Sequence, residues 1–170
     1  HAVRAVGTNT LRVAKNAKPF LRRARAALGF PIEVVAGREE ARLIYLGVSH
    51  SLPASREKRL VIDIGGGSTE CIIGAGYKPQ KLESLFMGCV SYSLRYFRDG
   101  RVSKAAFKEA EFAARAELQP IVGHYIRGNW QQAVGSSGTI RALAEILELS
   151  GYTEGPITLA GLDRLRSQLI

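Results

Sequence analysis

The stretch that most constrains the fold is the run from Leu60 to Gly74, which reads LVIDIGGGSTECIIG. Two apolar segments flank a short loop of glycines and hydroxyl residues, and too few residues separate them for a helix. The pattern therefore predicts a β-hairpin. Because glycine lacks a Cβ atom, Gly65, Gly66 and Gly67 can adopt left-handed backbone dihedrals and bring their amides close to a bulky anion.

The polar side chains around this loop favour phosphate binding over a simple flexible turn, which is the alternative reading. Ser68 and Thr69 supply hydroxyl donors, and Asp63 lies where the first strand meets the loop. No lysine follows the glycines, so the loop is not a Walker A motif. A strand and not a helix comes next, so it is not a dinucleotide-binding fingerprint either. We predict a phosphate loop with a carboxylate beside it.

A second loop of small residues lies between a short predicted strand and a helix predicted over residues 140–149. Free amides and the helix dipole point at a loop in this position, which makes it a candidate anion site. Its residues are Gly135, Ser136, Ser137, Gly138 and Thr139. The same pattern is also typical of an ordinary N-cap by Ser137 or Thr139.

A third informative stretch, GREEARLIYLGVSH, begins at Gly37 and predicts a helix with Glu39 and Glu40 in its first turn. Acidic residues at this position often do no more than interact with the helix dipole. Helical periodicity does not choose between the two as a functional acid.

The net charge of +9 is concentrated near the start of the chain, where residues 1–30 hold seven basic side chains and no acid. Such a face attracts polyanions, although a merely solvated helix face gives the same pattern. No aromatic stacking platform accompanies the strip, which argues against nucleic-acid binding. No apolar run is long enough to span a membrane, so we expect no transmembrane segment.

The remaining pattern predicts an α/β chain. Strands are expected at residues 2–6, at 32–35 as a buried strand, and at 81–87; helices are expected at 10–28 with a break near Lys18-Pro19, at 88–97, at 104–127 and at 159–170. Cys71 and Cys89 lie in apolar settings without CxxC spacing, so both are expected to be reduced and buried.

The motifs GTNTLR, GREEARLIYLGV, DIGGGSTE, MGCVS and VGSSGT occur along the chain in this order. In the order and spacing of these motifs, the chain resembles the exopolyphosphatase and guanosine pentaphosphate phosphatase family. The resemblance implies the actin-like (ribonuclease H-like) α/β fold shared with sugar kinases and Hsp70 chaperones. It also implies a piece of a longer protein, with residues 1–45 ending a first domain, residues 46–170 forming most of a second, and a further phosphate loop upstream of His1.

The same resemblance implies roles for individual residues. Glu40 matches the catalytic base, and Asp63 matches a carboxylate linked to Mg²⁺. Arg12 matches an arginine near the phosphate path. The loops Gly65–Thr69 and Gly135–Thr139 match the family's phosphate-binding loops.

The implied reaction is hydrolysis of the terminal phosphoanhydride of inorganic polyphosphate, or conversion of the stringent-response nucleotide pppGpp to ppGpp, with release of orthophosphate. The sequence does not rank these two substrates. The resemblance further implies a homodimeric full-length protein, located in the cytoplasm, either free or peripheral to the inner membrane. The basic strip from Arg12 to Arg25 is expected to hold a long substrate between cuts.

Two other functions stay open from the sequence. One is an ATP-dependent kinase of the same fold in which the Gly135 loop holds the adenosine, but no sugar or acyl acceptor site is recognisable. The other is a non-catalytic module that senses polyphosphate or (p)ppGpp. The acids Glu40 and Asp63 argue against it, because a pure polyanion binder gains nothing from carboxylates beside its ligand.

Overall fold

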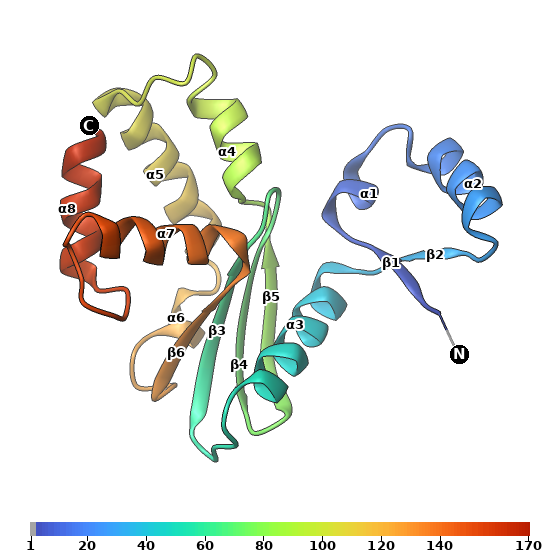
Figure 1. Cartoon of the computed structure of the whole chain (residues 1–170), viewed down its shortest axis with the longest axis horizontal. Helices are drawn as coiled ribbons and strands as arrows, with labels where there is room; N and C mark the ends of the chain where they lie inside the picture. The colour runs from blue at the N-terminus through green and yellow to red at the C-terminus, as the bar shows by residue number, and fades with distance from the viewer. Residues whose placement is uncertain (1–2) are drawn as a thin grey trace.

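The structure, a computed structural model, describes residues 3–170 and places a small N-terminal unit beside a larger sheet-and-helix unit (Figure 1). The N-terminal unit contains β1 (Ala5–Gly7), α1 (Asn9–Val13), α2 (Ala17–Leu28) and β2 (Ile32–Val34), with β1 and β2 paired in parallel. The rest of the chain forms α3 (Gly37–Ser51), β3 (Lys58–Ile64), β4 (Thr69–Ala75), β5 (Lys78–Leu85), α4 (Cys89–Tyr96), α5 (Lys104–Leu118), α6 (Val122–Tyr125), β6 (Gln132–Ser136), α7 (Ser137–Leu149) and α8 (Leu159–Leu169).

The larger unit is built on a four-stranded sheet with the order β5-β4-β3-β6. Strands β3, β4 and β5 form an antiparallel meander, and β6 returns to pair in parallel with β3. The predicted hairpin is confirmed, with Ile64 paired to Thr69 across the glycine loop. An antiparallel meander joined by a parallel crossover strand confirms the predicted mixed α/β, actin-like fold class.

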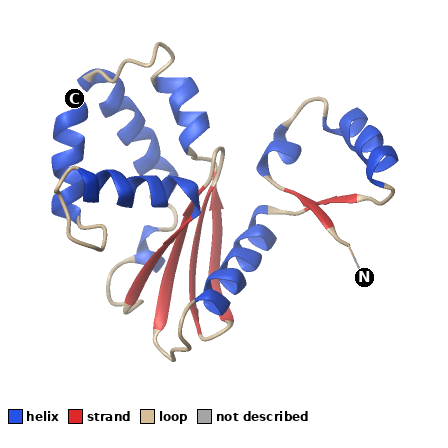
Figure 2. Cartoon of the chain, viewed as in Figure 1, coloured by secondary structure: helices blue, strands red, loops and turns tan. Residues whose placement is uncertain are grey.

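Helices cover both faces of this sheet (Figure 2). Helix α3 packs on one face, where Ala41 and Tyr45 are fully buried against Val61 and Ile72. The other face carries a second core of Cys71, Leu85 and Ile121. Because neighbouring strand residues point to opposite faces, Cys71 and Ile72 belong to different cores.

Two predicted helices are divided in the structure, and proline accounts for one division. The helix predicted at 104–127 ends at Leu118 because Pro120 has no N–H to continue the ladder. The helix predicted at 10–28 is two helices, α1 and α2, separated at residues 14–16. Pro19 does not break α2, since it lies in the first turn, where no intrahelical donor is required.

Two burial predictions are wrong. Strand β2 is exposed at Glu33 and Val34 because it pairs with a single neighbouring strand, β1, although Val35, where the predicted strand ends, is buried. Cys89 is exposed, whereas Cys71 is buried; both thiols are free. Strand β1 begins at Ala5, and Ala2, where the prediction started it, lies outside the described residues.

Within residues 3–170, no helix is both long and apolar enough to cross a membrane. The predicted domain boundary near residue 45 falls inside α3, which runs from Gly37 to Ser51. That boundary stays a prediction.

The two cysteines are expected to differ in reactivity. Burial, reinforced by the nearby Glu70 and Glu83 carboxylates, raises the pKa of the Cys71 thiol to about 11. Between pH 9 and 11 the folded chain then keeps this proton whereas the unfolded chain has lost it, so the free energy of unfolding falls as pH rises from about 9 towards 11.

At pH 8, thiol titration should show a fast phase from Cys89 and a phase from Cys71 at least about a hundredfold slower.

The variant Cys89→Ser should remove the fast phase and leave the slow one. Denaturant should merge the two phases in the unsubstituted protein. Rapid labelling of Cys71 in the folded Cys89→Ser variant would contradict the burial of this thiol.

Candidate active site

Two adjacent rows of paired residues lie on the same face of the sheet, and one row is polar whereas the other is apolar. The polar row consists of Ser84, Glu70, Asp63 and Ser136, from β5, β4, β3 and β6 in turn. The apolar row, Leu82, Ile72, Val61 and Val134, packs beneath α3. Since every second strand residue lies on one face, the polar row continues the surface that α3 covers.

The first turn of α3 reaches the polar row. A Cβ atom on Gly37 would lie 2.5 Å from Oγ of Ser84, so the helix begins directly against this row. Three residues later, the side chain of Glu40 is only 16% exposed. Nη1 of Arg12, from α1, donates to Oε2 of Glu40 at 2.8 Å and to the carbonyl of Val35 at 2.9 Å.

The neighbouring acid is placed differently. Glu39 accepts hydrogen bonds of 2.8 and 2.7 Å from Arg42 on its own helix, and its side chain is 39% exposed. The structure therefore brings Arg12 together with Glu40 and not with Glu39. The roles assigned to Glu40 and Arg12 stay predictions.

Burial and mutual repulsion raise the pKa of both carboxyls in the polar row. Asp63 has its pKa raised mainly by desolvation and also by the charge of Glu40, while a hydrogen bond from Ser136 lowers it. Glu70 is 1% exposed, and burial raises its pKa against the hydrogen bonds from Ser84 and Ser68. Ser84 Oγ donates to Glu70 Oε1 at 2.8 Å. The row is thus short of positive charge.

The sequence analysis did not identify Glu70 as a site residue, although the register of the predicted hairpin indicates it. Pairing the two strands of the predicted hairpin around a four-residue loop places the residue after Thr69 opposite Asp63. Directly paired residues of an antiparallel ladder share a face, so this register identifies Glu70 as a second carboxylate of the site.

The glycine loop is fixed by the N-terminus of α4. The amide of Cys89 donates to the carbonyl of Gly65, and the amides of Val90 and Ser91 donate to the carbonyl of Gly66, each at 2.9 Å. In a planar trans peptide the N–H points opposite to the preceding C=O. The N–H groups of Gly66 and Gly67 therefore point away from α4, and neither donates to a backbone acceptor in the described chain.

The expectation that Gly65, Gly66 and Gly67 adopt left-handed backbone dihedrals is wrong. Their missing Cβ atoms instead allow neighbouring residues to pack closely against the loop. None of the three loop glycines has a positive φ. A Cβ on Gly66 would lie 3.4 Å from Val90, and one on Gly67 would collide with the side-chain amide of Asn9. The motif MGCVS also gains a role, since Gly88 lies against the backbone of Gly66 and Gly67.

Several hydroxyls predicted to bind phosphate also hold the loops in place. Thr69 Oγ1 donates to the carbonyl of Met87 at 2.7 Å, and Ser68 is buried beside Glu70. In the second loop, Ser137 has φ of 81° and donates through Oγ to the carbonyl of Ile64 at 2.8 Å. The end of β3 therefore joins the two glycine loops, whose phosphate contacts stay predictions.

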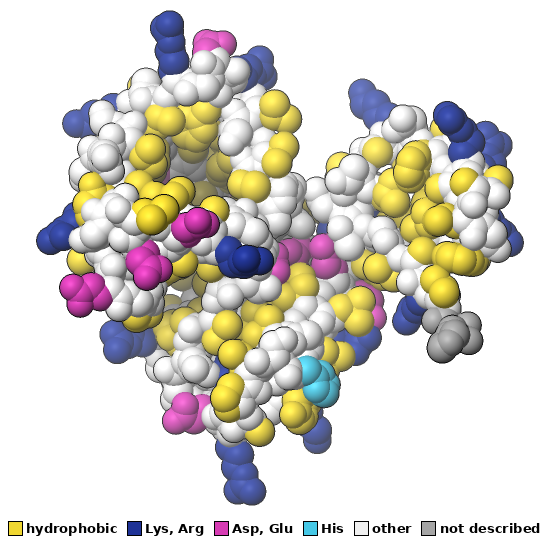
Figure 3. Space-filling model, viewed as in Figure 1, with side chains coloured by type: hydrophobic (Ala, Val, Ile, Leu, Met, Phe, Trp, Pro, Cys, Tyr) yellow, Lys and Arg dark blue, Asp and Glu magenta, His cyan; other side chains and the backbone are white. Residues whose placement is uncertain are grey.

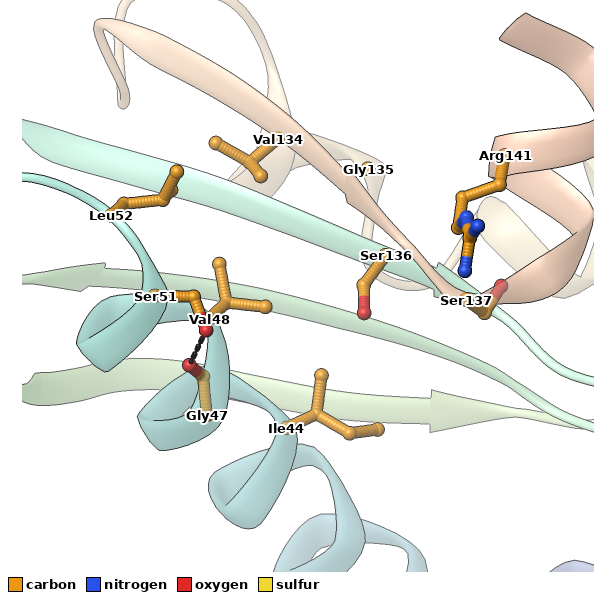
Figure 4. Close-up of a pocket in the computed structure, with 10 residues that line it drawn as sticks. All are labelled: Ile44, Gly47, Val48, Ser51, Leu52, Val134, Gly135, Ser136, Ser137 and Arg141. Atoms are coloured by element: carbon orange, nitrogen blue, oxygen red, sulfur yellow. Dashed lines mark hydrogen bonds between the residues drawn. The ribbon is translucent and has the colours of Figure 1, made fainter. Parts of the chain in front are cut away.

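A pocket of about 500 Å³ lies beside the second loop, between α3 and the start of α7 (Figure 4). Ile44 and Val48 of α3 and Val134 of β6 form apolar wall, and Ser136 and Arg141 supply polar groups. Gly138 and Thr139 do not line it.

The donor set of the polar row fits Mg²⁺. Within residues 3–170, no three His, Cys, Asp or Glu side chains come together as a ready metal cluster. Mg²⁺ is usually held by one or two carboxylates together with substrate phosphates, so it does not need such a cluster. Asp63 and Glu70, paired across β3 and β4 with raised pKa values, would be its ligands.

Comparison with known proteins identifies the family of this chain. The model of the Ppx/GppA phosphatase family matches residues 1–170. A PPX-GPPA enzyme of Aquifex aeolicus is 32% identical, with 86% of this chain and 47% of that chain covered and a TM-score of 0.66. An exopolyphosphatase from Cytophaga hutchinsonii is 26% identical, with 98% of this chain and 56% of that chain covered and a TM-score of 0.78. The chain thus spans about half the length of these relatives.

Substituting Gly88 should disturb the glycine loop. The Cβ of Gly88→Ala would lie 2.5 Å from backbone atoms of both Gly66 and Gly67, so the loop must shift. We expect the free energy of unfolding to fall by about 1–3 kcal/mol, as for overpacking, with a loss of phosphate affinity. Thermal denaturation and phosphate titration of the full-length protein measure both.

Gly47→Ala is the matched control, because a Cβ there meets nothing within 4 Å. It lies within α3 and should be neutral or stabilising by up to about 1 kcal/mol. Equal behaviour of the two variants would show that Gly88 does not support the loop.

Proposed function

Because this chain belongs to the Ppx/GppA phosphatase family, we propose that the protein carrying it hydrolyses the terminal phosphoanhydride of inorganic polyphosphate, or of pppGpp to give ppGpp, and releases orthophosphate. The observation that supports the proposal is the polar row beneath Glu40, next to a loop in which the N–H groups of Gly66 and Gly67 have no acceptor among the described residues. The activity is proposed for the whole protein, because the chain spans only about half the length of its relatives. A homodimeric state and a need for Mg²⁺ are part of the same proposal.

Transfer of a terminal phosphoryl group to water depends on positioning and on neutralising the charge of its oxygens. The amides of Gly66 and Gly67 are fixed donors for those oxygens, because α4 holds the loop before any substrate binds. Arg12 adds a cation beside Glu40. Mg²⁺ bound by Asp63 and Glu70 would supply further positive charge to the phosphate oxygens.

In this proposal Glu40 acts on a water molecule as the general base. Nη1 of Arg12 donates to Oε2 of Glu40 at 2.8 Å, which restrains the carboxylate. No hydrogen bond within the described residues uses Oε1, so that oxygen can accept a proton from water in line with the scissile bond. The water oxygen bonds to the terminal phosphorus as the bond from that phosphorus to the leaving phosphate oxygen breaks, and the proton removed from water goes to Glu40.

The basic strip offers a path for a long substrate. Lys15, Lys18, Arg22, Arg23 and Arg25 are all exposed, and Figure 3 shows Lys and Arg side chains gathered around α2. They follow Arg12 directly in sequence, and Arg12 lies in the site. A polyphosphate chain on this strip would be retained between successive cuts.

Glu40→Gln should lower kcat of the full-length protein by about 10²–10⁴-fold with little change in KM, because the amide cannot take the proton. Orthophosphate release from polyphosphate and from pppGpp measures it. The matched control is Glu39→Gln, which breaks only an exposed pair with Arg42 and should change kcat less than about twofold.

Unchanged release by Glu40→Gln would remove Glu40 from the role of base. A large loss with Glu39→Gln would transfer that role to its neighbour. If the unsubstituted protein releases no orthophosphate from either substrate, the proposed function itself is wrong.

Binding of long polyphosphate should weaken as salt rises, because exposed cations are screened. Tripolyphosphate, which is too short to occupy the strip, should show a smaller salt slope. The double variant Arg22→Gln, Arg25→Gln should reduce the slope for the long chain alone. Equal slopes for both substrates in the unsubstituted protein would contradict a role for the strip.

A further inference from the structure

The side-chain amide of Asn9 lies over the glycine loop and has no hydrogen-bond partner among residues 3–170. Asn9 begins α1, and its Nδ2 atom and Cγ atom lie against Gly67, where an added Cβ would collide with the former. Within residues 3–170, Oδ1 of Asn9 is enclosed and accepts no hydrogen bond. Nδ2 likewise donates to no acceptor among the described hydrogen bonds, but it is not enclosed.

This arrangement is unfavourable for the folded chain alone. An enclosed carbonyl without a donor loses its hydration without compensation, and native structures contain few such groups. The orientation that encloses Oδ1 leaves the NH₂ group directed at the loop. Local costs of this kind are typical of ligand-binding positions, where the arrangement serves the complex and not the free protein.

The surroundings of Nδ2 identify the ligand. It lies beside Gly67, whose own N–H points away from α4 and has no backbone acceptor in the part of the chain that the structure describes. One turn further along α1, Arg12 reaches Glu40. Residues three apart on a helix share a face, so Asn9 and Arg12 are directed to the same site. The free donors here, from Asn9, Gly66 and Gly67, match the acceptor-only oxygens of a phosphoryl group.

We propose that Asn9 is a substrate-contacting residue that donates its side-chain NH₂ to an oxygen of the phosphoryl group held by the amides of Gly66 and Gly67. The inference rests on the proposed function, and the chemical class of its ligand is a terminal phosphate. Asn9 thereby completes the loop from outside: three donors surround one phosphate, two from the hairpin backbone and one from α1.

Two substitutions of similar size test the contact in the full-length protein. Asn9→Asp removes the NH₂ donors and places a negative charge against the phosphate. Asn9→Leu removes donors and the enclosed carbonyl together. Binding of imidodiphosphate, whose P–N–P bridge serves as a stable analogue of the anhydride, is measured by calorimetry, and Tm is measured by thermal denaturation.

Both variants should raise the Kd for imidodiphosphate at least about tenfold. Asn9→Leu should leave Tm unchanged or raise it, because an unpaired buried carbonyl is lost. Stability and binding then change independently, which a purely structural role for Asn9 would not produce. The matched control is Asn16→Asp, an exposed asparagine preceding α2, whose Kd should change less than about twofold.

Unchanged Kd in both Asn9 variants would overturn the inference, as would a parallel loss of Tm and binding in Asn9→Leu. Orthophosphate release by the unsubstituted protein is measured beside these titrations. If it hydrolyses polyphosphate or pppGpp while the Asn9 variants bind normally, the inference fails and the proposed function stands. If it hydrolyses neither, the proposed function fails, and the titrations still decide whether Asn9 contacts phosphate.

Discussion

The packing of α3 on the sheet is the interaction on which the site depends. Ala41 and Tyr45 are fully buried against Val61 and Ile72, and this contact fixes the helix over β3 and β4. The polar row lies one step further along the same strands, so the helix that seals the core also carries Glu40 to the carboxylates. Burial of apolar surface at about 25 cal/mol per Å² supplies free energy that offsets the repulsion among those acids.

The acids themselves give the physical reason for the cationic partners in the proposed function. Glu70 is 1% exposed and accepts hydrogen bonds from the hydroxyls of Ser84 and Ser68, and Asp63 is directly opposite it. Enclosed carboxylates without cations are costly, which is the reason their pKa values are raised. Substrate phosphate alone would worsen this repulsion, so a metal ion and phosphate are expected to bind together at this row.

The sequence predicted what depends on near neighbours and missed what depends on packing between elements. Local periodicity and glycine content predicted the hairpin that contains Asp63 and the helix that carries Glu40. The structure contains both. Glu70 required the strand register, and the contacts of Gly88 and Asn9 required knowing what lies beside the loop. The glycines looked like positions for left-handed backbone, but their absent Cβ atoms instead admit neighbouring atoms.

Arg12 links the N-terminal unit to α3 through Nη1 and keeps its other nitrogens available as donors. The amide of Val35 donates to the carbonyl of Gly7 at 3.0 Å, and the carbonyl of Val35 accepts from Nη1 of Arg12, so the strand leading to α3 orients the guanidinium. Glu40 accepts from that same Nη1 atom. Among the hydrogen bonds of residues 3–170, Nε and Nη2 of Arg12 have no acceptor. Because a guanidinium has five N–H donors in a fixed plane, phosphate can bind these two nitrogens while Nη1 keeps Glu40 in place.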